Sequence, residues 1–357
     1  MKLNRNLEAP QSILIIKLSA IGDVVHSLPV LEVLRNSYPG ARIDWVVEEA
    51  ASGIIEGNPA VDEVIVSPRG SVVRSAAAGD AGGCIGDVRR FIGRLRSIRY
   101  DLVIDLQGLL KSGIVAGLAR GRRKVGMSDS REGAGFFLTE PAFPVNREIH
   151  AVDRYLSVAA KLGCDISDWD GSLPVTEADR ENVGRLLHAE GVGEAGFIAV
   201  NPVAKWGTKL WIPVRFSRLC DRIAHEVGYR IVFTGGGSDA AYVEGIVSEM
   251  NMPAVNLAGR TSLRELASIY ERAGLLVTTD TGPMHIAAAM KCPVVALFGP
   301  TSPVRTGPYG TGHRVVRSGA ACSPCFKKKC ADPHCMSGIG VDNVFEAVKA
   351  CLIRGRS

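Results

Sequence analysis

Short apolar runs alternate with helical patterns along this chain, and this alternation limits the folds that the chain can adopt. The first runs cover 13–17, 41–48, 64–66 and 101–105, and a second series covers 197–201, 230–234, 254–257, 275–279 and 294–298. Strands separated by helical lengths predict βαβ units with a parallel sheet and right-handed crossovers. We therefore expect an α/β protein with two doubly wound, Rossmann-like domains.

The boundary between the two series is predicted from a polar stretch, CDISDWDGSLPVTE at 164–177, which interrupts both periodicities. The length of 357 residues also favours two domains over one. We expect an N-terminal domain over 1–170, a second domain over 178–340 and a C-terminal helix over 341–357. Ligand crevices form at the carboxyl ends of such sheets, so the active site is expected in a cleft between the domains.

Composition and charge exclude several classes of protein. With 46% apolar and 22% charged residues, the chain can bury a core and is not a disordered protein. Its net charge of +5 is too small to require nucleic acid but fits an anionic small ligand or a membrane surface. No apolar run reaches the ~18 residues of a membrane span, and the first twelve residues lack a signal sequence. We expect a cytoplasmic protein.

Asp23 lies in the loop between the first apolar run and the first helical pattern, near a predicted helix N-terminus. An Asp at this position is often a helix cap. A carboxylate at the mouth of a crevice can instead accept the proton of an attacking hydroxyl, which typically accelerates a reaction about 10²–10⁴-fold. Both interpretations are open from the sequence. His26, one turn later, is expected to lie beside Asp23.

Three further loops follow strands of the second series and suit an anionic ligand. The first opens a helix, where free N–H groups and a glycine favour phosphate, although an ordinary cap has the same residue types. The second loop is a glycine turn, which either contacts a ribose or phosphate or is an ordinary left-handed turn. The third loop carries a lysine, which either neutralises a diphosphate or is exposed to solvent without a ligand. The candidate residues are Asp280, Thr281, Gly282 and His285 in the first loop, Gly235, Gly236 and Asp239 in the second, and Lys209 in the third.

Arginines and cysteines form two further clusters. Arg120 to Lys124 and five preceding arginines are able to bind phosphates or carboxylates of an acidic acceptor or lipid headgroups, or they form a solvated helix face. The five are Arg89, Arg90, Arg94, Arg96 and Arg99.

The cysteine pattern C-x₂-C-x₄-C-x₄-C can form a structural zinc site, with disulfides as the alternative. Its members are Cys322, Cys325, Cys330 and Cys335.

Five segments together resemble the lipopolysaccharide heptosyltransferases, a glycosyltransferase family (family 9) of the GT-B type. They are IIKLSAIGDVVHSLPVL near the N-terminus, DWVVEE at 44–49, DLQGLLKS at 105–112, HAVDR at 150–154 and TTDTGPMHIAAAMKCPVVALFGPTSP at 278–303. The resemblance runs through most of the chain in the family's order, and the DWVVEE segment is most similar to heptosyltransferase I.

The resemblance implies an inverting, metal-independent transfer of L-glycero-D-manno-heptose from ADP-heptose to a Kdo sugar of Kdo-lipid A. It also implies that the protein acts at the cytoplasmic face of the inner membrane as a peripheral membrane protein, and that it does not bind nucleic acid. By the same resemblance Asp23 is the general base and Lys209 stabilises the departing ADP, while Asp280, Thr281, Gly282 and His285 bind the donor. Acceptor binding is implied for Gln107, Lys111, Arg131 and Arg154.

Two features depart from this family pattern and keep alternatives open. Ile212 stands between Trp211 and Pro213, where the family has Pro directly after Trp, and the cysteine cluster is more reminiscent of members other than heptosyltransferase I. The alternatives are heptosyltransferase II, a relative that uses another nucleotide sugar, and a non-catalytic nucleotide-sugar-binding protein. A binding protein needs a diphosphate site but no base, so Asp23 counts against it.

Overall fold

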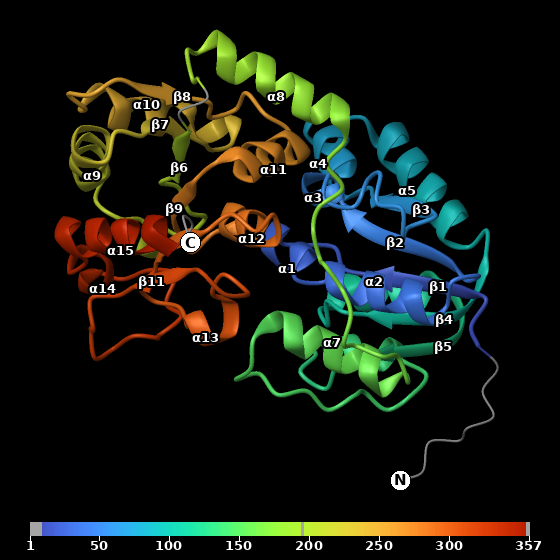
Figure 1. The fold of residues 1–357 in the computed structure, drawn as a ribbon. Coiled ribbons are helices and arrows are strands. Elements are labelled where there is room, and N and C mark those ends of the chain that lie inside the picture. The colour runs from blue at the N-terminus through green and yellow to red at the C-terminus, as the bar shows by residue number, and fades with distance from the viewer. Residues whose placement is uncertain (1–8, 194–195, 355–357) are drawn as a thin grey trace. The chain divides into compact units, whose positions relative to one another are not determined.

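The computed structural model describes residues 9–193 and 196–354, and the chain separates into two compact units. Unit 1 is Met1–Pro174 and unit 2 is Val175–Ser357. Each unit contains one parallel sheet with helices packed against it (Figure 1). The expected α/β class with two doubly wound sheets is confirmed.

The sheet of unit 1 is built from five parallel strands. They are β1 (Ser12–Ile16), β2 (Arg42–Glu48), β3 (Glu63–Ser67), β4 (Arg99–Asp105) and β5 (Arg120–Gly126). Their order across the sheet is β3-β2-β1-β4-β5. Each run of the first series forms one of these strands, but β5 was not expected because its sequence RGRRKVG is basic. An edge strand tolerates such side chains, since one of its sides has no neighbouring strand.

Helices cover both faces of this sheet. They are α1 (Ile21–Val25), α2 (Leu28–Ser37), α3 (Glu49–Ser52), α4 (Arg69–Ala77), α5 (Ala81–Leu95), α6 (Leu110–Leu118), the 3-10 turn η1 (Ala134–Phe137) and α7 (Ala151–Lys161). Leu14 and Ile16 of β1 pack in one core with Phe91 of α5 and Val115 of α6. On the other face α2 and α7 lie together (Figure 1). The first helical segment of the chain divides into α1 and α2, and Pro29 lies in the first turn of α2, where proline is favoured.

The sheet of unit 2 has six parallel strands. They are β6 (Phe197–Asn201), β7 (Arg230–Phe233), β8 (Ala254–Asn256), β9 (Leu275–Thr279), β10 (Val294–Leu297) and β11 (Arg314–Val316). Their order is β11-β10-β9-β6-β7-β8. The short edge strand β11 was not expected, because its three residues carry no apolar periodicity.

Helices of unit 2 again occupy both faces of the sheet. They are α8 (Glu177–Ala189), η2 (Gly207–Lys209), α9 (Pro213–Glu226), η3 (Gly237–Asp239), α10 (Ala240–Ser248), α11 (Leu263–Arg272), α12 (Gly282–Ala289), α13 (Pro303–Thr306), α14 (His334–Ser337) and α15 (Val341–Arg354). Phe216 of α9, Val243 of α10 and Phe345 of α15 pack in one core with strand residues such as Val277. Within the described ranges, no helix combines the length and apolarity that crossing a membrane requires.

Both sheets contain a point at which the strand order reverses. In unit 1 the chain adds β2 and β3 on one side of β1 and then places β4 on the other side. In unit 2 it adds β7 and β8 beside β6 and then places β9 on the opposite side. In open α/β sheets, ligands bind at the carboxyl ends of the strands at this switch point. The loops after β1 and β4, and after β6 and β9, are therefore the places to look for function.

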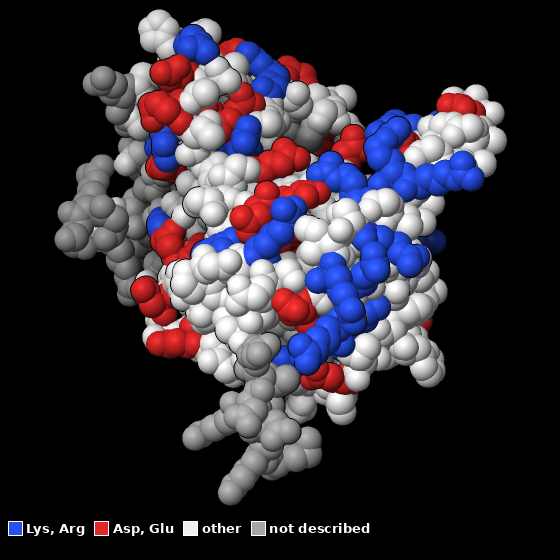
Figure 2. Space-filling model, turned by 90° about the vertical axis from the view of Figure 1, so that its right-hand side faces the viewer, with Lys and Arg blue, Asp and Glu red and all other residues white. Residues whose placement is uncertain are grey.

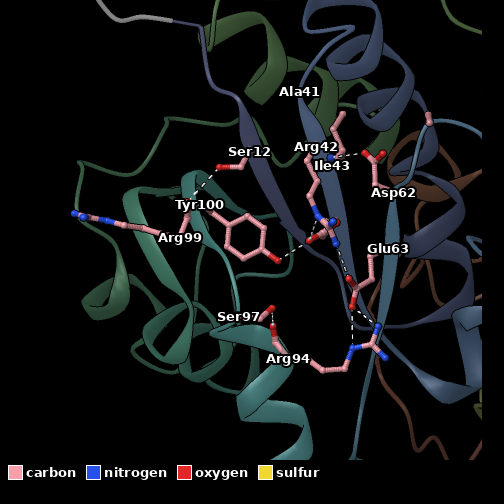
Figure 3. A network of polar contacts seen from close by, with 12 residues as sticks. Ser12, Ala41, Arg42, Ile43, Asp62, Glu63, Arg94, Ser97, Arg99 and Tyr100 are labelled. Atoms are coloured by element: carbon pink, nitrogen blue, oxygen red, sulfur yellow. Dashed lines mark hydrogen bonds and ion pairs between the residues drawn. The ribbon is translucent and has the colours of Figure 1, made fainter.

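A buried polar network ties β2 to β4 in unit 1 (Figure 3). The Tyr100 hydroxyl donates to Oδ2 of Asp44 at 2.7 Å, and Arg42 Nε lies 3.0 Å from Oδ1 of the same carboxylate. Arg42 and Arg94 both pair with Glu63 on β3. Burial raises the pKa of Asp44, while the hydrogen bonds from Tyr100 and Arg42 oppose that rise. The network therefore compensates for a carboxyl group that has no access to water.

Tyr100→Phe is expected to lower the free energy of unfolding by about 1–3 kcal/mol, because it leaves the buried Asp44 without its phenolic donor. Urea denaturation followed by circular dichroism measures this loss. Tyr229→Phe is the matched control, since the Tyr229 hydroxyl has no hydrogen bond to a described residue, and a change within about 0.5 kcal/mol is expected. Equal effects of the two substitutions would show that the Tyr100 hydroxyl does not contribute to the free energy of unfolding.

Candidate functional site

Asp23 lies in α1, directly after the loop that leaves the carboxyl end of β1 at the switch point of unit 1. Its side chain is half-buried. Oδ2 accepts a hydrogen bond from the backbone N–H of Ala20 at 3.3 Å and so caps the start of α1. The capping role is therefore present in the structure, and it leaves Oδ1 of Asp23 available to another donor.

Two buried side chains connect Oδ1 of Asp23 to the interior of unit 1. The Tyr155 hydroxyl, from α7, lies 3.3 Å from this oxygen, and Nζ of Lys17 lies 2.7 Å from the Tyr155 hydroxyl. Nζ of Lys17 also donates to the backbone carbonyl of Leu106, at the end of β4, at 2.9 Å. Lys17 and Tyr155 are each only 2% exposed. We call these three side chains the Lys17–Tyr155–Asp23 network; its exposed end is the carboxylate.

The protonation states of this network determine the direction of its hydrogen bonds. Burial disfavours the charged form of Lys17, but Tyr155 and two nearby carboxyl groups outweigh it and raise the pKa of Lys17. Burial also raises the pKa of the Tyr155 phenol. At neutral pH Lys17 is thus an ammonium ion and Tyr155 a neutral phenol. An ammonium ion only donates, so the Tyr155 oxygen accepts from Lys17 and its single proton is donated to Asp23.

Gln107 and Lys111 hold the loop that precedes Asp23. The backbone N–H of Ser19 donates to Oε1 of Gln107 at 3.1 Å, and Nζ of Lys111 donates to Oγ of Ser19 at 2.6 Å. Lys111 also pairs with Glu48 at 2.8 Å. Burial alone would raise the pKa of Glu48, but Lys111 and a second cation lower it. Two of the predicted acceptor residues therefore contact Ser19 in the loop that precedes Asp23, and acceptor binding itself stays a prediction.

The other two predicted acceptor residues are less closely connected to this loop. The backbone N–H of Arg131 donates to the carbonyl of Gly108 at 2.8 Å, and the Arg131 side chain is exposed. Arg154 is next to Tyr155 in α7, and its guanidinium carbon lies 5.5 Å from the centre of the Tyr155 ring. Nε of Arg154 is buried without a hydrogen-bond partner in the described ranges. Arg154 therefore interacts with the network through Tyr155, while Arg131 contacts the loop after β4 through its backbone.

At the switch point of unit 2, a lysine that follows β6 meets a carboxylate that follows β9. Nζ of Lys209 lies 2.6 Å from Oδ2 of Asp280 and 3.3 Å from its backbone carbonyl. The Thr301 hydroxyl, after β10, donates to the same Oδ2 at 2.6 Å. Nζ of Lys209 also lies 4.6 Å from the centre of the Trp206 ring. The Lys209 and Asp280 side chains are 16% and 6% exposed, so this ion pair is largely shielded from water.

The remaining residues of the predicted donor loop begin α12. Thr281 is its N-cap residue and makes no capping hydrogen bond with its side chain, and Gly282 is the first helical residue. His285 lies buried in the following turn. The Thr281 hydroxyl is therefore not used as a cap, and donor binding by these residues stays a prediction.

The glycine turn that follows β7 has a packing role that the sequence did not distinguish from ligand binding. Gly259 adopts a φ of +77°, and a Cβ there would lie 2.7 Å from Cα of Gly237. The N–H of Gly236 donates to Oδ2 of Asp239 at 2.9 Å, and the carbonyl of Gly235 accepts from Gly259 at 2.9 Å. Close backbone approach explains these glycines in part, while ligand binding by Gly235, Gly236 and Asp239 remains untested.

The cysteine segment gives no support to a structural zinc site. In the described part of the chain, no group of three or more His, Cys, Asp or Glu side chains is placed to hold a metal ion, and all nine cysteines are free. Cys335 is buried against the core, whereas Cys322 and Cys330 are exposed. The zinc prediction for Cys322, Cys325, Cys330 and Cys335 is corrected accordingly. The N–H of Cys325 donates instead to the carbonyl of Pro300 at 3.0 Å, beside Thr301.

Lys and Arg side chains form a band on one face of the molecule (Figure 2). Several arginines of α5 are neutralised: Arg90 pairs with Asp87, and Arg94 pairs with Glu63. Others are exposed and have no ion pair with a described residue. These unpaired arginines are Arg89, Arg96, Arg99, Arg120 and Arg122. Arg99 and Arg120 are register partners at the starts of β4 and β5. They therefore lie at the amino ends of the strands, whereas Asp23 follows the carboxyl end of β1.

Sequence reasoning missed Lys17, Tyr155 and Thr301. A lysine at the end of an apolar run that predicts a buried strand is a usable signal, because a buried ammonium ion requires partners. No local signal marks Tyr155, which is 132 residues from Asp23. Thr301 falls within the recognised segment at 278–303, but its hydroxyl gains a meaning only when β10 is placed beside β9.

Comparison with known proteins gives a consistent result. Residues 88–336 match the family described as glycosyltransferase family 9 (heptosyltransferase). A curated relative, lipopolysaccharide heptosyltransferase 1 of Pseudomonas aeruginosa, is 32% identical over 332 residues, covering 89% of this chain and 87% of the relative.

Solved structures agree with this match. A family 9 glycosyl transferase from Veillonella parvula has a TM-score of 0.80 at 27% identity, covering 96% of this chain and 97% of that one. The E. coli heptosyltransferase WaaC with ADP has a TM-score of 0.75 at 26% identity, covering 95% of this chain and 99% of that one. Both sheets of this chain therefore have the GT-B arrangement of strands.

Asp280→Asn is expected to lower the free energy of unfolding of unit 2 by about 3 kcal/mol, because it leaves the shielded Lys209 ammonium without its counter-charge. Urea denaturation followed by tryptophan fluorescence measures the loss, since Trp206 and Trp211 both lie in unit 2. The double variant Lys209→Met with Asp280→Asn should recover part of the lost free energy of unfolding, because it also removes the unpaired ammonium ion.

Glu271→Gln is the matched control for this ion pair. It breaks the Arg180–Glu271 pair, which has a similar distance of 2.9 Å but side chains that are each 35% exposed. A loss below about 1 kcal/mol is expected there. A loss of the same size in both variants would contradict the shielding of the Lys209–Asp280 pair.

Proposed function

The chain belongs to glycosyltransferase family 9, the heptosyltransferase family, and from this premise we propose that it acts as heptosyltransferase I. It transfers L-glycero-D-manno-heptose from ADP-heptose to a Kdo residue of Kdo-lipid A in lipopolysaccharide core biosynthesis. The observation that carries the proposal is the placement of charged side chains at both switch points, with Asp23 in one unit and the Lys209–Asp280 pair in the other.

In the proposed reaction Asp23 is the general base. Its carboxylate accepts the proton of the acceptor hydroxyl while that oxygen forms a bond to the anomeric carbon of heptose. The bond from this carbon to the diphosphate oxygen breaks, and its electron pair leaves with ADP. Attack from the side opposite the leaving group inverts the anomeric centre. The half-exposed position of Asp23 supports this role, because a base must be reachable by the acceptor.

Lys209 stabilises the negative charge that develops on the departing ADP. A shielded ammonium ion interacts with such charge more strongly than one in water. The short contacts from Asp280 and Trp206 keep Nζ of Lys209 in one place before the donor binds. Since a fixed cation supplies this charge, we propose that the transfer requires neither a metal ion nor another cofactor.

Donor binding is proposed for the loops at the carboxyl ends of the unit 2 strands, and acceptor binding for the loops of unit 1. N–H groups at the start of α12 favour the diphosphate, and contacts with sugar hydroxyls are proposed for Asp280 and His285. The glycine turn with Asp239 is proposed to contact the nucleoside. Lys111, beside Ser19, and Arg154, beside Tyr155, are proposed to attract the acidic groups of the acceptor.

Asp23→Asn is expected to reduce heptose transfer by about 10²–10⁴-fold while ADP-heptose still binds, because the amide cannot accept the acceptor proton. The measurement uses purified protein with ADP-heptose and Kdo₂-lipid A, mass spectrometry of the lipid product, and calorimetry for donor binding. Asp239→Asn is the control at the donor side, where a change in donor affinity and not in the chemical step is expected.

The acceptor experiment also separates this function from its alternatives. Wild-type protein that leaves Kdo₂-lipid A unchanged but adds heptose to an already heptosylated core is heptosyltransferase II. Binding of ADP-heptose without transfer to either acceptor identifies a nucleotide-sugar-binding protein. Full activity of Asp23→Asn would contradict the base assignment.

We extend the proposal to peripheral contact with the cytoplasmic face of the inner membrane, since the proposed acceptor is a lipid. The unpaired arginines at the starts of β4 and β5 support this contact, because an arginine near anionic headgroups contributes about 1 kcal/mol of attraction. Arg99 points away from the polar network around Tyr100 and is free to meet such a surface (Figure 3).

Arg99→Glu with Arg120→Glu is expected to reduce co-sedimentation with vesicles containing phosphatidylglycerol by at least about ten-fold, because two attractive charges become repulsive. Binding to vesicles of phosphatidylcholine alone should be weak for every variant. The matched control is Arg218→Glu with Arg314→Glu, two exposed arginines of unit 2 with the same change in charge. An equal reduction in both double variants would show that net charge, and not this edge of unit 1, controls the binding.

A further inference from the structure

The Lys17–Tyr155–Asp23 network has a geometry that goes beyond what capping or general-base catalysis requires. A cap uses only Oδ2 of Asp23, and a base needs only an accessible carboxylate. The structure adds a buried phenol at 3.3 Å from Oδ1 and a buried ammonium ion at 2.7 Å from that phenol. A buried charge lowers the free energy of unfolding unless it is paired, so a buried ammonium ion at this place indicates a role beyond capping.

We propose that Tyr155 is a positioning residue that fixes the Asp23 carboxylate and couples it to the charge of Lys17. This inference rests on the proposed function, in which Asp23 is the general base. The Tyr155 hydroxyl separates the ammonium ion from the carboxylate by one hydrogen-bonding group. Lys17 thus orients the Tyr155 hydroxyl toward Asp23 without forming a direct ion pair that would occupy the base.

The contacts around the network support fixed positions for all three members. Lys17 is held by the carbonyl of Leu106 at 2.9 Å, and its own carbonyl accepts from Nε1 of the buried Trp45 at 3.2 Å. The Asp23 carboxylate is held by Ala20 on one oxygen and by Tyr155 on the other. Because each carboxylate oxygen can accept more than one hydrogen bond, the carboxylate stays able to accept the acceptor proton.

Other charged and titratable groups also surround this network. Asp105, on β4, interacts with Lys17, and Arg154 interacts with Tyr155. His26, after α1, and His150, before α7, are in edge-to-face ring contact at 5.1 Å. Glu48 and Lys111 pair beside Ser19. Tyr155→Phe changes none of these groups, so a comparison with wild type isolates the hydroxyl.

Tyr155→Phe is expected to lower kcat by roughly 10–100-fold, because the transition state requires an oriented base. The KM values for both substrates should stay within about two-fold, since no substrate contact is removed. A tyrosine that only stabilises the fold would leave the kcat of the folded protein unchanged, so the loss of kcat at constant KM is the readout that distinguishes a positioning role.

Tyr100→Phe is the matched control, because Tyr100 is also buried in unit 1 and donates to a carboxylate, but that carboxylate is Asp44. Tyr100→Phe should lose stability without a comparable loss of kcat. If Tyr155→Phe behaves in the same way, the inference is wrong.

A second measurement does not depend on activity. Urea unfolding midpoints of Asp23→Asn, Tyr155→Phe and the double variant should be non-additive, because the two side chains interact directly. Additive midpoints would overturn the inference. If Tyr155→Phe does not fold, Lys17→Met replaces it in the same cycle. Absence of heptose transfer by wild type together with non-additive midpoints would reject the proposed function and retain the coupling.

Discussion

Parallel strand pairing is the constraint on which the rest of this structure depends. Because all strands of a sheet point the same way, their carboxyl ends meet at one edge, and the reversal of strand order opens a crevice there. In unit 1 this brings the loop after β1 beside the end of β4, and in unit 2 it brings the loop after β6 beside the start of α12. The contacts of Lys17 with Leu106 and of Lys209 with Asp280 each cross one of these two points.

The largely buried lysine at each switch point is stabilised by a different arrangement of partners. Each lysine is mostly removed from water, which requires a nearby negative or polar partner. Lys209 is paired directly with Asp280, and Thr301 supports the carboxylate. Lys17 instead reaches Asp23 through the Tyr155 hydroxyl. In the function proposed above, the first arrangement holds the cation that meets the diphosphate, and the second leaves the carboxylate able to accept a proton.

The cysteine segment illustrates how a strong local pattern can mislead. Four cysteines at short spacings have the right chemistry for zinc, but metal binding also needs the ligands in a suitable geometry. In the described part of the chain no group of side chains has that geometry; Cys335 packs into the core of unit 2, while Cys322 and Cys330 are exposed. Backbone hydrogen bonds from Cys325 and Phe326 to Pro300 connect the segment to the loop that carries Thr301. Its visible structural effect is therefore to support the neighbourhood of Asp280.

The sequence by itself determined the class of fold, nearly all strands, and the loops that carry Asp23, Lys209 and Asp280, because apolar periodicity and residues at strand ends are local properties. It missed β5 and β11, whose edge positions do not require apolar side chains. Only the tertiary structure decided which side chains meet. Tyr155 contacts Asp23 across 132 residues, and Thr301 contacts Asp280 across 21. Such contacts depend on strand order and helix packing, which no local pattern encodes.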